Sequence, residues 1–337
     1  MSAGPRFAFL THGGPAIGMG HVGRSLSLAR ALAAADAREV FLLGREIRVT
    51  DAVEAAGFDA VETDWESAGA ATRDLVAALH PEVLVVDSYA VSGELFDLLR
   101  PVVGRLVAID DVADRPLPVH TVVNGGAGAE QLEYRGALPD TTYLLGPRYA
   151  LLDPAYGAAP TRKTRRSVER VLVTVGGSSH AGALQAVLRA ALSLDAAAVD
   201  VVLGPFAADE MSEALEDSRV VVHRGVSVLR PLMLAADLAV SGAGMTLLEL
   251  AATATPTVFL TLASNQEPNA SAFERAGAAL PAGSPSGPDF GAAVVLNLKR
   301  LAGDPALRES LGANARKLVD GLGAQRVAQA LTAVRHR

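Results

Sequence analysis

Short apolar runs alternate with longer segments rich in alanine and leucine along most of the chain. Up to about residue 145 these runs lack polar alternation, which is typical of strands covered on both faces and therefore of a parallel sheet between helices. The intervening segments carry leucine and alanine at helical spacing. The pattern predicts strands at 7–10, 39–43, 60–62, 83–86, 106–109 and 121–123.

One break in this pattern divides the chain. Between Leu145 and Val168 proline and glycine are frequent without periodicity, which marks a connection between domains. Beyond it the pattern predicts strands at 171–175, 199–203, 220–222, 238–240 and 258–260, then helices at 292–301, 305–318 and 326–334. The length of 337 residues also favours two domains. We expect two α/β domains, 1–158 and 168–337, and the last helix can cross back to the first.

Composition narrows the class of protein. The net charge of −7 argues against a general nucleic-acid-binding protein, and the absence of cysteine excludes disulfides, thiolate metal sites and a cysteine nucleophile. No apolar run is long enough to span a membrane, and the N-terminus lacks the apolar stretch of a secretory signal. We therefore expect a soluble, cytoplasmic protein. The basic cluster 162–166 is interpreted as a solvated linker rather than a ligand site.

A glycine-rich stretch at 12–24 follows the first predicted strand and precedes a helix predicted from Ser25. Ligands bind at such places in α/β units, because free backbone N–H groups and the helix dipole favour an anionic group. Residues 18–23 satisfy the G-x-G-x-x-G pattern of dinucleotide-binding proteins, and Glu46 follows at a suitable distance for ribose. However, the first glycine lies too far from the strand, and His21 stands where a pyrophosphate needs a small residue. His21 is therefore the candidate reactive residue, and the glycines give clearance around it.

The second half contains a strand, a turn of small residues and a helix at 236–250. Such a turn lets backbone N–H groups approach a phosphate closely. Glu249 suits ribose hydroxyls or, with Thr246, a capping box.

A loop rich in amides follows the next predicted strand. Asn265, Gln266 and Asn269 offer donors and acceptors for sugar hydroxyl and acetamido groups; the alternative is an asparagine N-cap with solvent-facing neighbours. A third glycine-rich turn, at 176–180, follows the strand predicted at 171–175.

The ordered series of motifs resembles one family. The series comprises Gly18-Met-Gly-His21-x-x-Arg24, Asp87-Ser88-Tyr89, Asp110-Asp111, Gly146-Pro-x-Tyr149-Ala150-Leu151-Leu152, Gly176-Gly177-Ser178, Asp237…Gly242-Ala-Gly244…Glu249 and Asn265-Gln266. It is similar to the PseG family, hydrolases of UDP-2,4-diacetamido-2,4,6-trideoxy-β-L-altropyranose in pseudaminic acid biosynthesis. That family shares the GT-B fold with the MurG-type N-acetylglucosaminyltransferases. Over about 7–276, the resemblance implies two Rossmann-like domains facing a central cleft.

The resemblance also implies a mechanism. His21 would be the general base for attack of water on the anomeric carbon of a UDP-sugar, with inversion, release of UDP and no metal or other cofactor. UDP leaves without protonation by an acid, and a histidine titrates near neutral pH, so the chemistry is reasonable. Arg24 would help with charge or pair with an acidic neighbour, and Asp87 and Tyr89 would orient sugar or water. The implied substrate-binding residues are Gly20, Gly177, Ser178, Val226, Gly242, Gly244, Met245, Thr246, Glu249, Asn265, Gln266 and Asn269.

Several features depart from the family pattern or stay open. Asp110 and Asp111 are adjacent, so they make a poor carboxylate pair, and one of them at most is functional. We expect His223 to be structural. His180 stands near a place where the family has an acidic residue, and its role is open, as is that of His12. A glycosyltransferase with an acceptor hydroxyl would use the same base, and a non-catalytic nucleotide-sugar binding protein is a third alternative.

Overall fold

The computed structural model describes residues 5–15, 17–35, 37–44, 46–175, 181–204, 216–226 and 228–333. The chain divides into two compact units: unit 1 is Met1–Pro154 with Leu322–Arg337, and unit 2 is Ala155–Gly321. The chain therefore crosses from one unit to the other twice, and its last helix belongs to unit 1.

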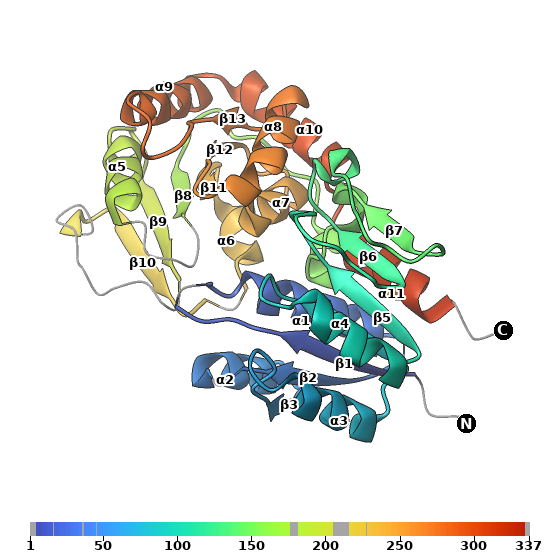
Figure 1. Cartoon of the computed structure of the whole chain (residues 1–337). Coiled ribbons are helices and arrows are strands. Elements are labelled where there is room, and N and C mark those ends of the chain that lie inside the picture. Colours follow the sequence, from blue (N-terminus) through green and yellow to red (C-terminus); the bar gives the residue numbers. More distant parts are fainter. Residues whose placement is uncertain are drawn as a thin grey trace. The chain divides into compact units, whose positions relative to one another are not determined.

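The described part of unit 1 contains a seven-stranded parallel sheet in the order β3-β2-β1-β4-β5-β6-β7 (Figure 1). The strands are β1 (Arg6–Thr11), β2 (Arg38–Leu43), β3 (Asp59–Glu62), β4 (Val83–Asp87), β5 (Arg105–Ile109), β6 (Thr121–Asn124) and β7 (Thr142–Leu145). The helices are α1 (Gly20–Ala33), α2 (Ile47–Ala55), α3 (Gly69–Leu79), α4 (Gly93–Leu99) and α11 (Gly323–Ala333). The sheet grows first from β1 to β3 and then, on the other side, from β4 to β7. The carboxyl ends of β1 and β4 thus form a topological switch point, where ligands bind in such sheets.

Helices cover both faces of this sheet. Phe7 and Phe9 of β1 pack in a core with α1, α2 and α11, whereas Ala8 and Leu10 pack in a second core with α3 and α4. All four side chains are fully buried. The apolar runs without alternation therefore reflect strands buried on both faces, as predicted.

The described part of unit 2 contains a six-stranded parallel sheet in the order β10-β9-β8-β11-β12-β13 (Figure 1). The strands are β8 (Arg170–Thr174), β9 (Ala198–Leu203), β10 (Val220–Arg224), β11 (Leu238–Gly242), β12 (Thr257–Leu260) and β13 (Leu280–Pro281). The helices are α5 (Ala181–Leu192), α6 (Arg230–Ala235), α7 (Met245–Ala252), α8 (Glu267–Arg275), α9 (Phe290–Gly303) and α10 (Pro305–Leu318). The switch point of this sheet lies between β8 and β11.

Three local features differ from the sequence-based expectations. The edge strands β7 and β13 were not predicted, because β7 is exposed at Thr142 and Tyr143 and β13 is too short to show a pattern. The helix expected from Ser25 begins at Gly20, where the N–H of Gly23 already donates to the carbonyl of Met19 at 2.8 Å. His21 and Arg24 consequently lie in the helix rather than in a loop.

The basic cluster at 162–166, expected to be a solvated linker, is solvated only in part. The guanidinium of Arg162 donates to the carbonyls of Ala236 at 2.5 Å and Met233 at 2.6 Å. Arg165 donates to Asp237 at 2.8 Å. Since the last carbonyls of a helix lack partners within it, Arg162 satisfies such groups at the end of α6. The linker is bound to unit 2.

Among the described residues, we find no helix whose length and hydropathy would suit a membrane span.

Candidate active site

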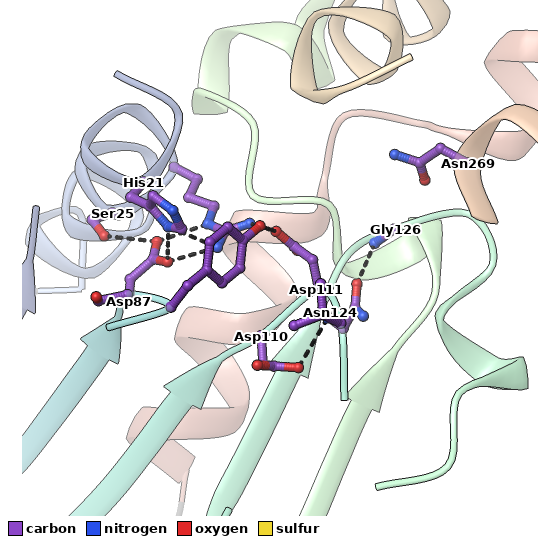
Figure 2. Close-up of polar contacts among 12 residues, drawn as sticks. His21, Ser25, Asp87, Asp110, Asp111, Asn124, Gly126 and Asn269 are labelled. Atoms are coloured by element: carbon purple, nitrogen blue, oxygen red, sulfur yellow. Dashed lines mark hydrogen bonds and ion pairs between the residues drawn. The ribbon is translucent and has the colours of Figure 1, made fainter. Parts of the chain in front are cut away.

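Three side chains of α1 converge on one carboxylate at the end of β4 (Figure 2). His21, Arg24 and Ser25 share a helix face because they are three and four residues apart. Nδ1 of His21 lies 2.6 Å from Oδ1 of Asp87, and the Ser25 hydroxyl donates to Oδ2 of Asp87 at 3.2 Å. Asp87 is completely buried, and His21 is 6% exposed. The structure thus brings together three of the candidate catalytic residues, His21, Arg24 and Asp87.

Arg24 bridges two carboxylates. Its Nε and Nη2 donate to the two oxygens of Asp87 at 2.7 and 2.6 Å, and its Nη1 donates to Oδ2 of Asp111 at 2.6 Å. This two-pronged geometry matches the planar fork of a guanidinium to a carboxylate, which makes a strong and directional contact. Of the two roles considered for Arg24, the structure shows pairing with acidic neighbours.

The charges of this cluster stabilise one another. Burial alone would raise the pKa of Asp87, but the nearby charges of Arg24 and His21 and the hydrogen bonds from both side chains lower it to about 2. Burial would lower the pKa of Arg24, but attraction by Asp111 and then Asp87 raises it above its usual value. Asp87 therefore stays ionised at neutral pH.

The ionised Asp87 determines which nitrogen of His21 carries hydrogen. A carboxylate only accepts hydrogen bonds, so Nδ1 of His21 must donate to it. Nη2 of Arg24 lies 3.1 Å from the same nitrogen, but both groups are then donors, and this contact is not a hydrogen bond. In the neutral ring the lone pair is consequently on Nε2, which can take up a proton.

Tyr89 and Asp111 extend the cluster. The Tyr89 ring lies edge-on to His21 with centroids 4.6 Å apart, and its hydroxyl donates to Oδ2 of Asp111 at 2.6 Å. Tyr89 is 38% exposed. From the sequence, at most one of Asp110 and Asp111 was expected to be functional, without a choice between them. The structure brings Asp111 to this cluster, because it follows β5, the strand beside β4, at the same edge of the sheet.

The neighbouring Asp110 has a different, structural environment. Its Oδ1 accepts the N–H groups of Val112 at 3.1 Å and Ala113 at 2.7 Å, and its Oδ2 lies 3.3 Å from Arg115. Burial raises the pKa of Asp110, against the effect of these hydrogen bonds and of Arg115. The two adjacent carboxylates thus serve different partners and do not form a catalytic pair.

The next strand end carries a turn that the sequence analysis did not single out. Asn124, the last residue of β6, accepts the N–H of Gly126 at 2.8 Å through Oδ1 and donates to the Tyr134 hydroxyl at 2.9 Å (Figure 2). The Tyr134 hydroxyl in turn donates to the carbonyl of Asp110 at 3.0 Å. These contacts fix the backbone at the edge of the sheet beyond Asp111.

The glycine-rich loop before α1 is folded back on itself. The N–H and carbonyl groups of Gly14 and Gly18 bond to each other at 3.1 and 2.7 Å, and Gly18 has a φ of 79°, which favours glycine. A Cβ at Gly20 would meet nothing within 4 Å, whereas one at Gly13 would lie 2.9 Å from Val49. Gly13 is therefore required for packing, and Gly20 leaves open space beside His21.

In unit 2 the turn predicted to bind a phosphate and the amide-rich stretch predicted to bind a sugar meet at the ends of the adjacent strands β11 and β12. Gln266 accepts the N–H of Leu262 at 3.0 Å, and Asn269 donates to the carbonyl of Ala243 at 3.1 Å. Gly242 ends β11 and Gly244 is the N-cap of α7. Asn269, in the first turn of α8, thus supports the glycine turn directly.

The remaining predicted residues of unit 2 are placed as follows. Helix α7 begins at Met245 after the N-cap Gly244, so Thr246 lies inside the helix and is not the cap of a capping box with Glu249. Asn265 lies in a short 3-10 helix, Ser264–Gln266, before α8, whose N-cap is Gln266. Asn265 is therefore not the N-cap considered as the alternative.

Two further residues lie at the end of β10. Val226 follows Gly225, which has a φ of 64°. Nε2 of His223 lies 2.7 Å from Asp200, a contact that fits the expected structural role. Gly177, Ser178 and His180 lie outside the described residues.

Among the described residues, no group of three or more histidines or carboxylates could hold a metal ion.

Comparison with known proteins identifies the fold. Residues 170–282 match the glycosyltransferase family 28 C-terminal domain. MurG of Acinetobacter baumannii has a TM-score of 0.67 at 14% identity, covering 98% of this chain and 100% of that chain. LpCGTa in complex with UDP has a TM-score of 0.69 at 14% identity, covering 98% and 99%. The protein therefore has the GT-B fold, as predicted, and these findings support a glycosyltransferase-like protein.

One relative matches a larger part of this chain in sequence. An uncharacterized protein of Methanocaldococcus jannaschii is 26% identical over 277 residues, which are 76% of this chain and 55% of that protein. The chain thus spans about half the length of this relative.

Proposed function

We propose that the protein is a nucleotide-sugar hydrolase, similar to PseG, that cleaves a UDP-sugar with inversion at the anomeric carbon. The observation that carries this proposal is the contact between His21 and the ionised Asp87. It orients an imidazole so that Nε2 is free to accept a proton, and it stabilises the imidazolium that results. Arg24 and Ser25 hold the carboxylate in place.

The reaction follows from this geometry. Nε2 of His21 takes a proton from water as the water oxygen bonds to the anomeric carbon. The bond from that carbon to the phosphate oxygen breaks, and its electron pair leaves with UDP. Because UDP is a stable anion, no acid is required to protonate it. Tyr89, edge-on to His21 and anchored by Asp111, orients the sugar or the water.

Unit 2 binds the nucleotide in this proposal. The turn at Gly242–Gly244 precedes α7, whose N-terminus favours a phosphate, and Glu249 one turn later suits ribose hydroxyls. The amide loop supplies Asn265 and Asn269 for the sugar. The match of residues 170–282 to a glycosyltransferase domain and the UDP complex of LpCGTa support this assignment.

The substrate class is a UDP-linked amino or deoxy sugar, in line with the resemblance to PseG and its place in pseudaminic acid biosynthesis. The match to glycosyltransferase family 28 favours a second candidate, transfer of the sugar to an acceptor hydroxyl. Both reactions use the same base, since a proton must leave water or an alcohol alike. They differ in whether UDP is released without an acceptor.

Incubation with a panel of UDP-sugars tests the proposal. Hydrolysis predicts release of UDP and free sugar in equal amounts without acceptor, and NMR of the first product shows the inverted anomer. His21→Asn, which can still donate to Asp87 but cannot accept a proton, abolishes turnover while leaving UDP binding intact. His80→Asn, at an exposed residue after α3, is the matched control and keeps full activity. Release of UDP that requires an added acceptor overturns hydrolysis in favour of transfer.

A further inference from the structure

A second histidine lies beside the candidate base. His12 directly follows β1, and its ring is edge-on to that of His21 with centroids 4.9 Å apart. It is only 6% exposed. The proton transfer proposed for His21 does not use it, so its burial at this position requires its own explanation.

The hydrogen bonds around His12 assign its hydrogen. The Ser88 hydroxyl oxygen accepts the N–H of Ala90 at 2.9 Å and lies 3.3 Å from Nδ1 of His12. We assign the Ser88 hydrogen to this second contact, so Nδ1 accepts and Nε2 carries the ring hydrogen. Glu66 lies 3.8 Å from Nδ1, beyond hydrogen-bonding distance, and its side chain is 59% exposed.

His12 is also uncharged at neutral pH. Burial, and then repulsion by His21, lower its pKa to about 4; Arg24 adds to this effect, and attraction by Asp87 does not outweigh it. A neutral donor does not oppose the positive charge that His21 gains when it takes up a proton. His12 is therefore suited to binding rather than to proton transfer.

Two buried donors remain unsatisfied here. Within the described residues, neither Nε2 of His12 nor Nε1 of Trp65 has a hydrogen-bond partner, and both atoms are buried. The two rings are 5.7 Å apart. A buried polar group without a partner is costly and uncommon in native proteins. Both groups are donors, so acceptor atoms of a bound ligand would satisfy them.

We propose that His12, together with Trp65, determines substrate specificity by donating hydrogen bonds to the carbonyl oxygen of an acylamino group on the sugar. A carbonyl oxygen has two lone pairs and no hydrogen, so it can accept from both rings, whereas a hydroxyl also brings a hydrogen for which these donors offer no acceptor. This inference rests on the proposed function, because the sugar must lie at His21.

Binding measurements with UDP-N-acetylglucosamine, UDP-glucose and UDP test this proposal, since the first two differ only in an acylamino group against a hydroxyl. Wild type binds UDP-N-acetylglucosamine more tightly than UDP-glucose. His12→Phe, which removes the donor, reduces this preference about tenfold, the effect of one hydrogen bond. His12→Gln keeps a donor and retains part of the preference. Trp65→Phe, which removes only the second donor, also lowers it.

The affinity for UDP alone separates the possible failures. It stays unchanged in all three variants, which shows that unit 2 binds normally, and thermal unfolding as in wild type shows that unit 1, which contains the substituted residues, is folded. A preference that is absent in wild type, or unchanged in His12→Phe, overturns the role of His12 while leaving hydrolysis intact. A wild-type protein that binds neither UDP nor either sugar overturns the proposed function as well.

Discussion

Nδ1 of His21 lies 2.6 Å from Oδ1 of Asp87, and the two residues are 66 positions apart in the sequence. The contact joins the first turn of α1 to the end of β4, at the switch point of the unit 1 sheet. A buried carboxylate in this position sets the orientation and the protonated nitrogen of an imidazole, as in other carboxylate–histidine pairs.

Replacement of Asp87 by asparagine tests this relationship. An asparagine amide can donate to Nδ1 and so favour the wrong tautomer, and it does not stabilise the imidazolium. We expect Asp87→Asn to lower kcat by about 10³- to 10⁴-fold, with UDP affinity unchanged, because the proposed function assigns nucleotide binding to unit 2. Asp97→Asn, at an exposed residue of α4, is the control. A kcat within threefold of wild type would show that the carboxylate does not support the base.

Arg24 should stabilise the folded protein as well as hold the Asp87 carboxylate in position. It is buried against Asp87 and Asp111, and its removal leaves two carboxylates without a counter-charge. We expect Arg24→Leu to lower the free energy of unfolding by about 3–5 kcal/mol. The only tryptophan of the sequence, Trp65, lies in unit 1, so urea denaturation followed by tryptophan fluorescence reports on this unit.

Arg30→Leu provides a matched comparison on the same helix. Arg30 makes a partly exposed ion pair with Asp153, and such pairs contribute up to about 1 kcal/mol. If Arg24→Leu and Arg30→Leu lower the free energy of unfolding equally, the buried ion pairs of Arg24 contribute no more to stability than the exposed pair of Arg30.

The fold could be predicted from local patterns, whereas the site could be predicted only in part. The apolar runs located the central strands because burial on both faces leaves a continuous signal. Edge strands such as β7 carry no such signal. Asp111 could not be chosen over Asp110, because its role depends on the adjacency of β4 and β5, which appears in the sheet order and not in spacing along the chain.

The start of α1 was predicted five residues too late because of its glycines. Gly20 and Gly23 suggested a loop, because glycine is unfavourable inside helices. The helix begins at Gly20 nevertheless, and its spacing places His21, Arg24 and Ser25 on one face, where all three contact Asp87. Similarly, Arg162 lies in a stretch that resembles a solvated linker, and only the tertiary structure provides its carbonyl partners.

The low pKa of His12 predicts a dependence of stability on pH. Its pKa in the folded protein is about 4, below the usual value of 6.5. Between these values the unfolded chain binds a proton that the folded protein does not, so the free energy of unfolding rises with pH. The contribution is present above pH 6.5 and is lost progressively as the pH falls toward 4. Asp87, with a pKa of about 2, stays ionised in this range.

We expect His12→Gln to reduce this slope, because glutamine does not titrate. Urea denaturation at pH 7, 5.5 and 4.5, followed by tryptophan fluorescence, gives the slope directly. His80→Asn removes an exposed histidine and serves as the control. A slope that is the same in His12→Gln and wild type would contradict the assignment of a neutral, buried His12.

Two glycines of unit 2 can be distinguished by what a methyl group would meet. A Cβ at Gly242 would lie 2.8 Å from the Leu262 side chain, closer than real contacts allow. One at Gly244 would lie 3.4 Å from Nε2 of Gln266, an ordinary contact. Gly244 has a φ of −91°, which alanine also adopts. Gly242→Ala should therefore require the Leu262 side chain to shift, while Gly244→Ala should leave the fold unchanged.

The proposed phosphate site predicts that Gly244→Ala weakens UDP binding although it leaves the fold unchanged. A methyl group at Gly244, the N-cap of α7, lies where a phosphate approaches the first N–H groups of the helix. We expect Gly244→Ala to weaken UDP binding at least tenfold by titration calorimetry, with thermal unfolding as in wild type. Gly303→Ala, where a Cβ at the end of α9 meets nothing within 4 Å, is the control for the substitution itself. If Gly244→Ala unfolds like wild type and binds UDP with unchanged affinity, the phosphates bind away from this turn.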